Sequence, residues 1–139
     1  MEKLENQIKT LTSNIRVQLM GSLPPDEVLE FYCDRELDLF INVSESEGMP
    51  VAIMEAFSAG IPAIATDVGG TSELVTPDTG ILLPENPSPE EVWKAIRTFI
   101  DFPFERKLQM RASAYHHYQM NFSSTVNAGK LLQYFIQAE

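Results

Sequence analysis

The stretch from Ser44 to Gly70, SESEGMPVAIMEAFSAGIPAIATDVGG, decides the fold that we expect. An apolar run at Leu37–Val43 precedes it and predicts a buried strand. The proline after the polar loop predicts the start of an almost wholly apolar helix over 50–59. Residues 62–66 then predict a second buried strand. Strand, helix and strand in this order are typical of an α/β fold with a parallel sheet.

The pattern on either side of this stretch extends the same alternation. It predicts a helix over 2–12, a strand over 15–20, a helix from Pro25, a short helix from Thr71, a strand over 80–83, and helices near 89–100, 104–120 and 123–137. We expect one domain over 1–139, with an α/β core over 1–83 and C-terminal helices over 84–139. The core would hold about four parallel strands in a three-layer αβα arrangement.

Two polar loops, Ser44–Pro50 and Thr66–Gly70, follow the ends of expected strands. The carboxyl ends of parallel strands meet at one edge of a sheet, and ligands bind outside that edge. We therefore expect the two loops to lie side by side at the functional rim.

The helix start near Pro50 has the features of an anion site. Its first amides lack an acceptor in the preceding turn, and with the helix dipole they favour a group such as a diphosphate. Gly48 leaves room for a ligand to approach the backbone. Glu47 precedes the helix, and Glu55 lies about 7.5 Å along its axis. Because a carboxylate can accept hydrogen bonds from a vicinal diol, the pattern indicates a diphosphate between two sugars, as in a nucleotide-sugar.

Each acid also has a structural interpretation. Glu47 can act as a helix cap or dipole partner, and Glu55 can pair with a cation or backbone group hidden in the fold. Taken singly, each acid is better explained in that way. Their joint placement around the helix start modestly favours a ligand.

The motif Glu47-Gly-Met-Pro-Val-Ala-Ile-Met-Glu55 resembles the donor-site motif of retaining GT-B glycosyltransferases. Its setting resembles glycosyltransferase family 4, the group 1 transferases: Ser-Glu-Ser-Glu-Gly-Met-Pro at its start, Ile-Met-Glu-Ala-Phe-Ser-Ala-Gly-Ile-Pro across its end, and Asp-Val-Gly-Gly-Thr-Ser-Glu-Leu-Val after it. The resemblance runs from about Ile15 to Leu83 and more loosely through the C-terminal helices. It implies a Rossmann-like donor domain, transfer of a sugar from a nucleoside-diphosphate sugar with retention, and no essential metal or cofactor.

The resemblance also implies a role for each residue of the motif. Glu55 would hold the ribose hydroxyls, and Glu47, the candidate catalytic residue, would face the donor hexose. The backbone between them would line the diphosphate: Gly48, Met49, Pro50 and Val51. More distant residues would border the base or the rim of the site: Gly21, Ser22, Gly69, Gly70 and Glu73. Glu73 is equally well explained as an acid in the first turn of a helix.

Members of this family bind the acceptor, a glycan or a lipid, mainly through a first domain for which this chain is too short. The resemblance begins near the third strand of the second domain. The two preceding strands, whose loops normally supply an Arg and a Lys to the diphosphate, have no counterpart. We therefore expect a truncated gene product or an excised domain, with weak donor binding and no transfer by this chain alone. The alternatives are a non-catalytic nucleotide or sugar binding module and an interaction fragment with a vestigial site.

The same omission affects the sheet, because the strands over 15–20 and Leu37–Val43 lose their usual neighbours. An unpaired apolar strand edge is an association hazard. We expect these two strands to pair with each other, and the alternative is a homodimer in which a second copy covers the edge.

The composition limits the choice of partner and compartment. The formal net charge of -10 argues against a nucleic-acid or anionic-membrane surface. A single cysteine, Cys33, excludes an internal disulfide and a thiolate metal cluster. The N-terminus is not a secretory signal, and no apolar run reaches transmembrane length. We expect a cytoplasmic protein, with a peripheral membrane position as an option for a full-length enzyme.

Overall fold

The computed structural model describes residues 6, 8 and 15–123. Its elements are α2 (Pro25–Asp34), β1 (Phe40–Asn42), α3 (Val51–Ser58), β2 (Ala63–Thr66), α4 (Thr71–Leu74), β3 (Gly80–Leu83), α5 (Pro89–Ile100) and α6 (Phe104–Asn121). Most of the expected elements are confirmed to within a residue or two at each end, although the strand expected over Leu37–Val43 is shortened to β1. The helices expected over 2–12 and 123–137 lie outside the described residues, apart from Asn6, Ile8 and Ser123.

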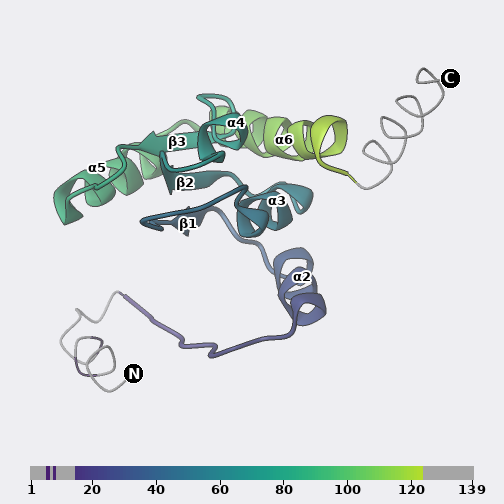
Figure 1. Cartoon of the computed structure of the whole chain (residues 1–139), viewed down its shortest axis with the longest axis horizontal. Coiled ribbons are helices and arrows are strands. Elements are labelled where there is room, and N and C mark those ends of the chain that lie inside the picture. The colour runs from purple at the N-terminus through teal and green to yellow at the C-terminus, as the bar shows by residue number, and fades with distance from the viewer. Residues whose placement is uncertain (1–5, 7, 9–14, 124–139) are drawn as a thin grey trace, which may run out of the picture.

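The sheet has three parallel strands in the order β1-β2-β3 (Figure 1). All four residues of the central strand β2 are buried, as expected for a strand covered on both faces. The register places Ile41 opposite Ile64 and Ala65 opposite Leu82. Parallel strands end at the same edge, so the loops after β1 and β2 leave the sheet together.

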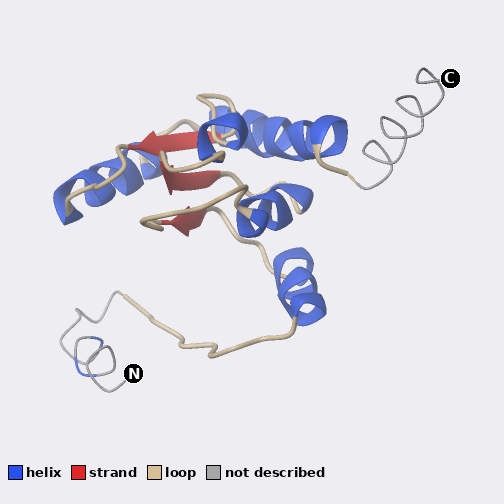
Figure 2. Ribbon diagram, viewed as in Figure 1, coloured by secondary structure: helices blue, strands red, loops and turns tan. Residues whose placement is uncertain are grey.

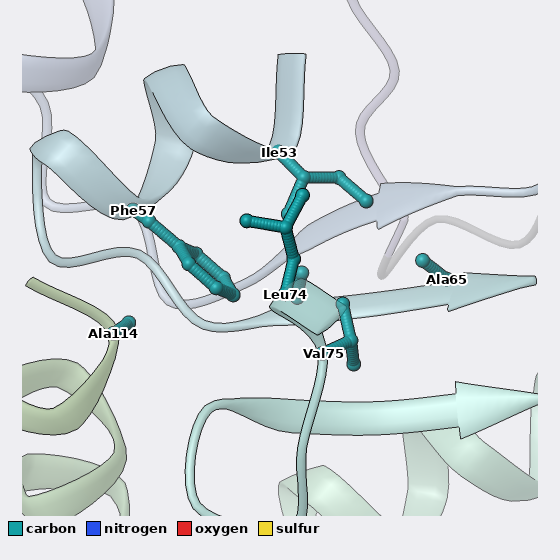
Figure 3. Packing of buried hydrophobic residues seen from close by; sticks show 7 residues of the cluster. Ile53, Phe57, Ala65, Leu74, Val75 and Ala114 are labelled. Carbon is teal, nitrogen blue, oxygen red and sulfur yellow. The ribbon is translucent and has the colours of Figure 1, made fainter. Parts of the chain in front are cut away.

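Helices lie on both sides of this sheet (Figure 2). One core cluster joins α3, α4 and α6 to the sheet, and Figure 3 shows the Phe57 ring of α3 directed toward Leu74 of α4. A second cluster packs Ala95 and Phe99 of α5 against Ile64 and Leu83. The expected α/β fold, with helices on both sides of a parallel sheet, is confirmed. Among the described helices, none has the length and apolar character needed to cross a bilayer.

The strand expected over 15–20 is wrong. These residues form neither a helix nor a paired strand, and the side chains of Ile15, Val17 and Leu19 remain 43–51% exposed. Their expected pairing with the Leu37–Val43 strand is therefore also wrong, and the sheet has three strands rather than four. Alternating apolar residues favour a strand, but a strand forms only where a neighbour pairs with its backbone groups. We call residues 15–24 the arm, which runs clear of the sheet before it enters α2 (Figure 1).

The start of α5 is fixed by the predicted capping box. The Glu91 amide donates to Ser88 Oγ (3.2 Å), and Glu91 Oε2 accepts from the Ser88 amide (2.8 Å). These bonds hold the pKa of Glu91 below its ordinary value, with the backbone amide of Ser88 as the largest cause.

We expect Ser88→Ala to lower the free energy of unfolding by about 1 kcal/mol, because the start of α5 loses the hydroxyl that caps it. Urea unfolding followed by circular dichroism checks this, and Thr98→Ala, within the same helix, serves as the control.

Candidate functional site

The two polar loops lie in direct contact at the carboxyl edge of the sheet. The Gly70 amide donates to Gly48 O (2.7 Å), and Thr66 Oγ1 donates to Ser44 O (2.6 Å). The expectation that strand direction brings these loops side by side is therefore met. The contact joins the segment before α3 to the segment before α4.

Gly69 makes this close approach possible. Its φ of +55° lies in the left-handed region, and a Cβ placed on it would lie 2.6 Å from Gly48 O and closer still to Glu47 O. A side chain at this position would collide with the backbone of the opposite loop, so one of the two loops would have to shift. The Gly69-Gly70 pair therefore has a structural role, whatever it contributes to a ligand.

Gly48 is different, because nothing in the described structure requires a glycine there. Its φ is not positive, and no atom lies within 4 Å of the position that a Cβ would take. The space beside its backbone is open. This is the arrangement expected where a ligand, rather than the protein, occupies the space.

Glu47 is held by a short polar network at the end of β1. Asn42 Nδ2 donates to Glu47 Oε1 (3.2 Å), and Asn42 Oδ1 accepts from the Ser44 amide (3.1 Å) and hydroxyl (2.6 Å). Donation from the Ser44 hydroxyl and from the Asn42 amide lowers the pKa of Glu47, and desolvation acts weakly in the opposite direction. Ser44 has one hydroxyl proton, so it serves Asn42 or Glu47 at a given moment but not both. Glu47 is therefore an oriented carboxylate at neutral pH.

Asn42 was not predicted as a site residue from the sequence. The available signal was the Asn-x-Ser spacing at the end of a strand, which is typical of an asparagine that bonds to the backbone two residues on. The network it forms makes it a positioning residue for Glu47.

The start of α3 offers free backbone donors beside Gly48. Pro50 is the buried N-cap residue, and no side chain caps the helix. The Ile53 and Met54 amides both reach Pro50 O, at 3.1 and 3.3 Å. The amides of Val51 and Ala52 donate no hydrogen bond within the part of the chain that the structure describes. Two donors and the positive end of the helix dipole thus remain available to an anion.

Glu55 lies one turn after Val51 on the same face of α3, because residues four apart share a helix face. Its side chain is half-buried and lies toward α2, where burial first and the negative charge of Glu55 second raise the pKa of Tyr32. The Glu55 carboxylate has no ion pair or hydrogen bond among the described residues. A hidden cationic partner, the structural explanation for this acid, is therefore not found in this part of the chain.

The other expected residues divide between the rim and the arm. Met49 and Val51 are exposed beside Gly48, and Met49 also contacts the side of Gly70 that a Cβ would occupy. Gly21 and Ser22 are exposed in the arm, which the structure does not bring to the loops (Figure 1). Glu73 is exposed on α4, and its carbonyl lies 2.9 Å from His117 Nε2.

Several described cationic side chains are engaged away from these loops. Arg111 donates to Leu37 O, Lys107 donates to Ile100 O, and the Arg97 guanidinium lies over the Trp93 ring. No group of three or more His, Cys, Asp or Glu side chains among the described residues could hold a metal ion. The site between the loops thus consists of helix amides, open backbone and the carboxylate of Glu47, and Glu55 lies one turn further along α3.

Comparison with known proteins identifies relatives. A family model described as "Glycosyl transferases group 1" matches residues 1–117. The O-antigen biosynthesis glycosyltransferase WbnH of Escherichia coli is 36% identical over 112 residues, which cover 81% of this chain and 31% of that protein. The chain thus spans about a third of the length of this relative.

Solved structures agree with the fold. Sucrose-phosphate synthase from Thermosynechococcus elongatus superposes with a TM-score of 0.77 at 21% identity, over 99% of this chain and 35% of that one. The pneumococcal O-GlcNAc transferase GtfA, solved in complex with UDP and GlcNAc, superposes with a TM-score of 0.67 at 22% identity, over 97% of this chain and 27% of that one. At these identities the likeness establishes the architecture alone.

Proposed function

The chain belongs to the group 1 glycosyltransferase family, and we propose that it is the donor-binding part of a retaining enzyme of the family 4 type. In this proposal the donor is a nucleoside-diphosphate sugar, and the acceptor is a glycan or a lipid bound by an N-terminal domain. The GtfA structure, which contains UDP and GlcNAc, and the O-antigen role in the name of WbnH support this class of donor and acceptor. We place the full-length enzyme in the cytoplasm, with a peripheral position at the membrane as an option.

One observation carries the proposal. The contact between Gly48 and Gly70 places open backbone, two free helix amides and the oriented carboxylate of Glu47 at one corner of the sheet. A diphosphate would accept hydrogen bonds from the amides of Val51 and Ala52. Glu47 would then accept from hydroxyls of the donor hexose, and Glu55, one turn further along α3, from those of the ribose.

The reaction that fits this arrangement is a substitution at the anomeric carbon of the donor. The bond between that carbon and the diphosphate oxygen breaks, and its electron pair leaves with the nucleoside diphosphate. An acceptor hydroxyl forms the new bond on the same face and passes its proton to the departing diphosphate oxygen. The helix amides stabilise the charge that develops on the leaving oxygen, which is the main contribution that preorganised donors make to catalysis. We propose that no metal ion or other cofactor takes part.

This chain alone would bind the donor weakly and would not transfer the sugar. Two phosphate charges would meet amides, and neither loop itself carries a Lys or an Arg, in a chain of net charge -10. An N–H donor to an anion contributes about 1.5–3 kcal/mol, so two of them contribute about 3–6 kcal/mol. The cost of association takes up most of that sum, so we expect binding no tighter than millimolar.

Titration of the isotope-labelled chain with UDP, GDP and ADP, followed by amide chemical shifts, tests the proposal. We expect shifts confined to residues 47–56 and their neighbours in the Thr66–Gly70 loop, unchanged by a chelator. The absence of shifts at millimolar nucleotide would contradict donor binding by this chain. Turnover of a nucleotide-sugar by the isolated chain would contradict its expected inactivity.

A second candidate function is a non-catalytic module or an interaction fragment whose site is vestigial. The engagement of Arg111, Lys107 and Arg97 away from the loops favours it. Nucleotide binding without preference for a sugar-bearing donor would indicate the module. The interaction fragment would bind neither nucleotide nor nucleotide-sugar.

Gly48→Ala separates a ligand role from a structural one. The added methyl group meets no protein atom within 4 Å, so we expect the thermal unfolding midpoint to stay within about 2 °C of the original. The methyl would obstruct a diphosphate that approaches the backbone, and we expect about tenfold weaker nucleotide binding. Amide-shift titration measures the affinity, and Ser72→Ala on the exposed face of α4 is the matched control. Unchanged affinity would show that the ligand does not approach this backbone.

A further inference from the structure

The loop that carries Glu47 is attached to the neighbouring loop at two points, one on each side of this acid. After Glu47, the Gly70 amide donates to Gly48 O (2.7 Å). Before Glu47, Thr66 Oγ1 donates to Ser44 O (2.6 Å). Both donors come from one segment, which begins at the end of β2. The position of Glu47 therefore depends on two bonds from this single neighbour.

Ser44 is held from both faces of the sheet. Asn42 is paired with Ala65, and paired residues of neighbouring strands share a face. Ala65 belongs to the core cluster that includes α3, whereas Thr66 follows it and lies on the opposite face with Ile64 and α5. Asn42 Oδ1 accepts from the Ser44 amide and hydroxyl on the first side, and Thr66 donates to the Ser44 carbonyl on the second. The amide, hydroxyl and carbonyl of Ser44 are thus all engaged.

The Thr66 hydroxyl is buried and has its acceptor in a distant part of the chain. The side chain is 2% exposed, and the other three residues of β2 are apolar. A buried hydroxyl destabilises a fold unless it forms a hydrogen bond. Threonine commonly meets this need with a backbone group a few residues away, but Ser44 lies 22 residues from Thr66. This hydroxyl therefore joins the two loops.

We propose that Thr66 is a positioning residue for the Glu47 carboxylate and acts on it through Ser44 and Asn42. The Thr66 hydroxyl fixes the Ser44 backbone, and Ser44 occupies the side-chain oxygen of Asn42. With its oxygen occupied, the Asn42 amide presents its NH₂ group in the other direction, where Nδ2 donates to Glu47 Oε1 (3.2 Å). The use of this carboxylate toward a donor hexose rests on the proposed function, but its orientation does not.

A purely structural role is the alternative, in which the same bond only holds the two loops together. The two roles differ in their effect on Glu47. Hydrogen bonds from Ser44 first and Asn42 second lower the pKa of Glu47. If Thr66 positions these donors, loss of its hydroxyl weakens their bonds to the ionised form, and the pKa of Glu47 rises toward its ordinary value. A lower stability of the fold would by itself leave this pKa unchanged.

Carbon-13 NMR of the side-chain carboxyl groups tests the proposal, with the full chain titrated from about pH 7 to about pH 3. Thr66→Val nearly keeps the shape of the side chain and removes its hydroxyl, whereas Thr66→Ser keeps the hydroxyl. We expect the pKa of Glu47 to rise in Thr66→Val and to stay low in Thr66→Ser. Glu91 is the internal control, because its pKa is lowered by the separate capping box of α5 and should not change in either variant.

A second measurement needs no substitution at Thr66. Coupling between two groups is reciprocal, so the Thr66 methyl signal of the original chain should shift with the midpoint at which Glu47 titrates. Glu47→Gln, which cannot ionise, should abolish that shift. This measurement decides the question even if Thr66→Val does not fold. Neither experiment contains a ligand, so a failure of nucleotide binding would leave both results unaffected.

Four outcomes would overturn the proposal. The first is an unchanged pKa of Glu47 in a folded Thr66→Val, and the second is an equal rise in Thr66→Ser. The third is a parallel change at Glu91, which would indicate a general loosening of the fold. The fourth is a Thr66 methyl signal that does not respond when Glu47 titrates.

Discussion

Gly69→Ala is expected to destabilise the fold by about 2–5 kcal/mol, the largest effect on stability of any single methyl group at the site. A residue with a side chain costs about 1–2 kcal/mol in the left-handed region that Gly69 occupies. Its Cβ would also press on the carbonyls of Glu47 and Gly48, and overpacking of this kind costs about 1–3 kcal/mol. The thermal unfolding midpoint should fall by roughly 10 °C.

Chemical unfolding of Gly69→Ala beside Gly48→Ala measures this effect. The two substitutions add the same methyl group to neighbouring loops, one against backbone and one into open space. A loss of less than about 1 kcal/mol at Gly69 would mean that the loops separate without cost and that their contact does not hold the rim together.

The second large effect is on binding. Glu55→Ala is expected to weaken nucleotide binding by about tenfold to a hundredfold, because hydrogen bonds between ribose hydroxyls and a carboxylate are worth about 1.5–3 kcal/mol. The side chain is only half-buried and has no partner among the described residues, so folding should be little affected. Tyr32 provides an internal check, since its pKa is raised partly by the charge of Glu55 and should fall toward its ordinary value.

Glu45→Ala is the matched control, because it removes the same charge from the exposed part of the same rim. Removal of any negative charge from a chain of net charge -10 should favour an anionic ligand through simple attraction. Affinity should therefore stay constant or rise in Glu45→Ala and fall in Glu55→Ala. Equal behaviour of the two variants would mean that Glu55 acts only through its charge.

Sequence periodicity predicted the parts of the fold whose partners lie nearby in the chain. Local pattern determines two of these parts, the apolar strand β2 and the capping box of α5. Short connections determine the third, the alternation of strands and helices from β1 to β3. The strand expected over 15–20 failed for the opposite reason. Its pattern is correct for a strand, but pairing depends on a neighbour that no local pattern specifies.

The candidate site was predicted in outline and not in detail. Strand direction brought the two loops together, and the chemistry of Glu47 and Glu55 drew attention to them. The sequence could not show that Gly69 needs a positive φ or that Asn42 orients Glu47, because both depend on how closely two distant backbones approach. The expected place of Gly21 and Ser22 near the loops depended on the pairing of the arm, and the structure leaves these residues apart.

The hydrogen bond between Gly70 and Gly48 makes the proposed ligand site part of the folding equilibrium. The site exists only while β1 and β2 hold their loops together, so the unfolded chain offers no competing site. A ligand of the folded state alone adds about 2.7 kcal/mol to its stability at a hundred times the dissociation constant. Thermal melting with different nucleotides would therefore rank their affinities without any assay of transfer.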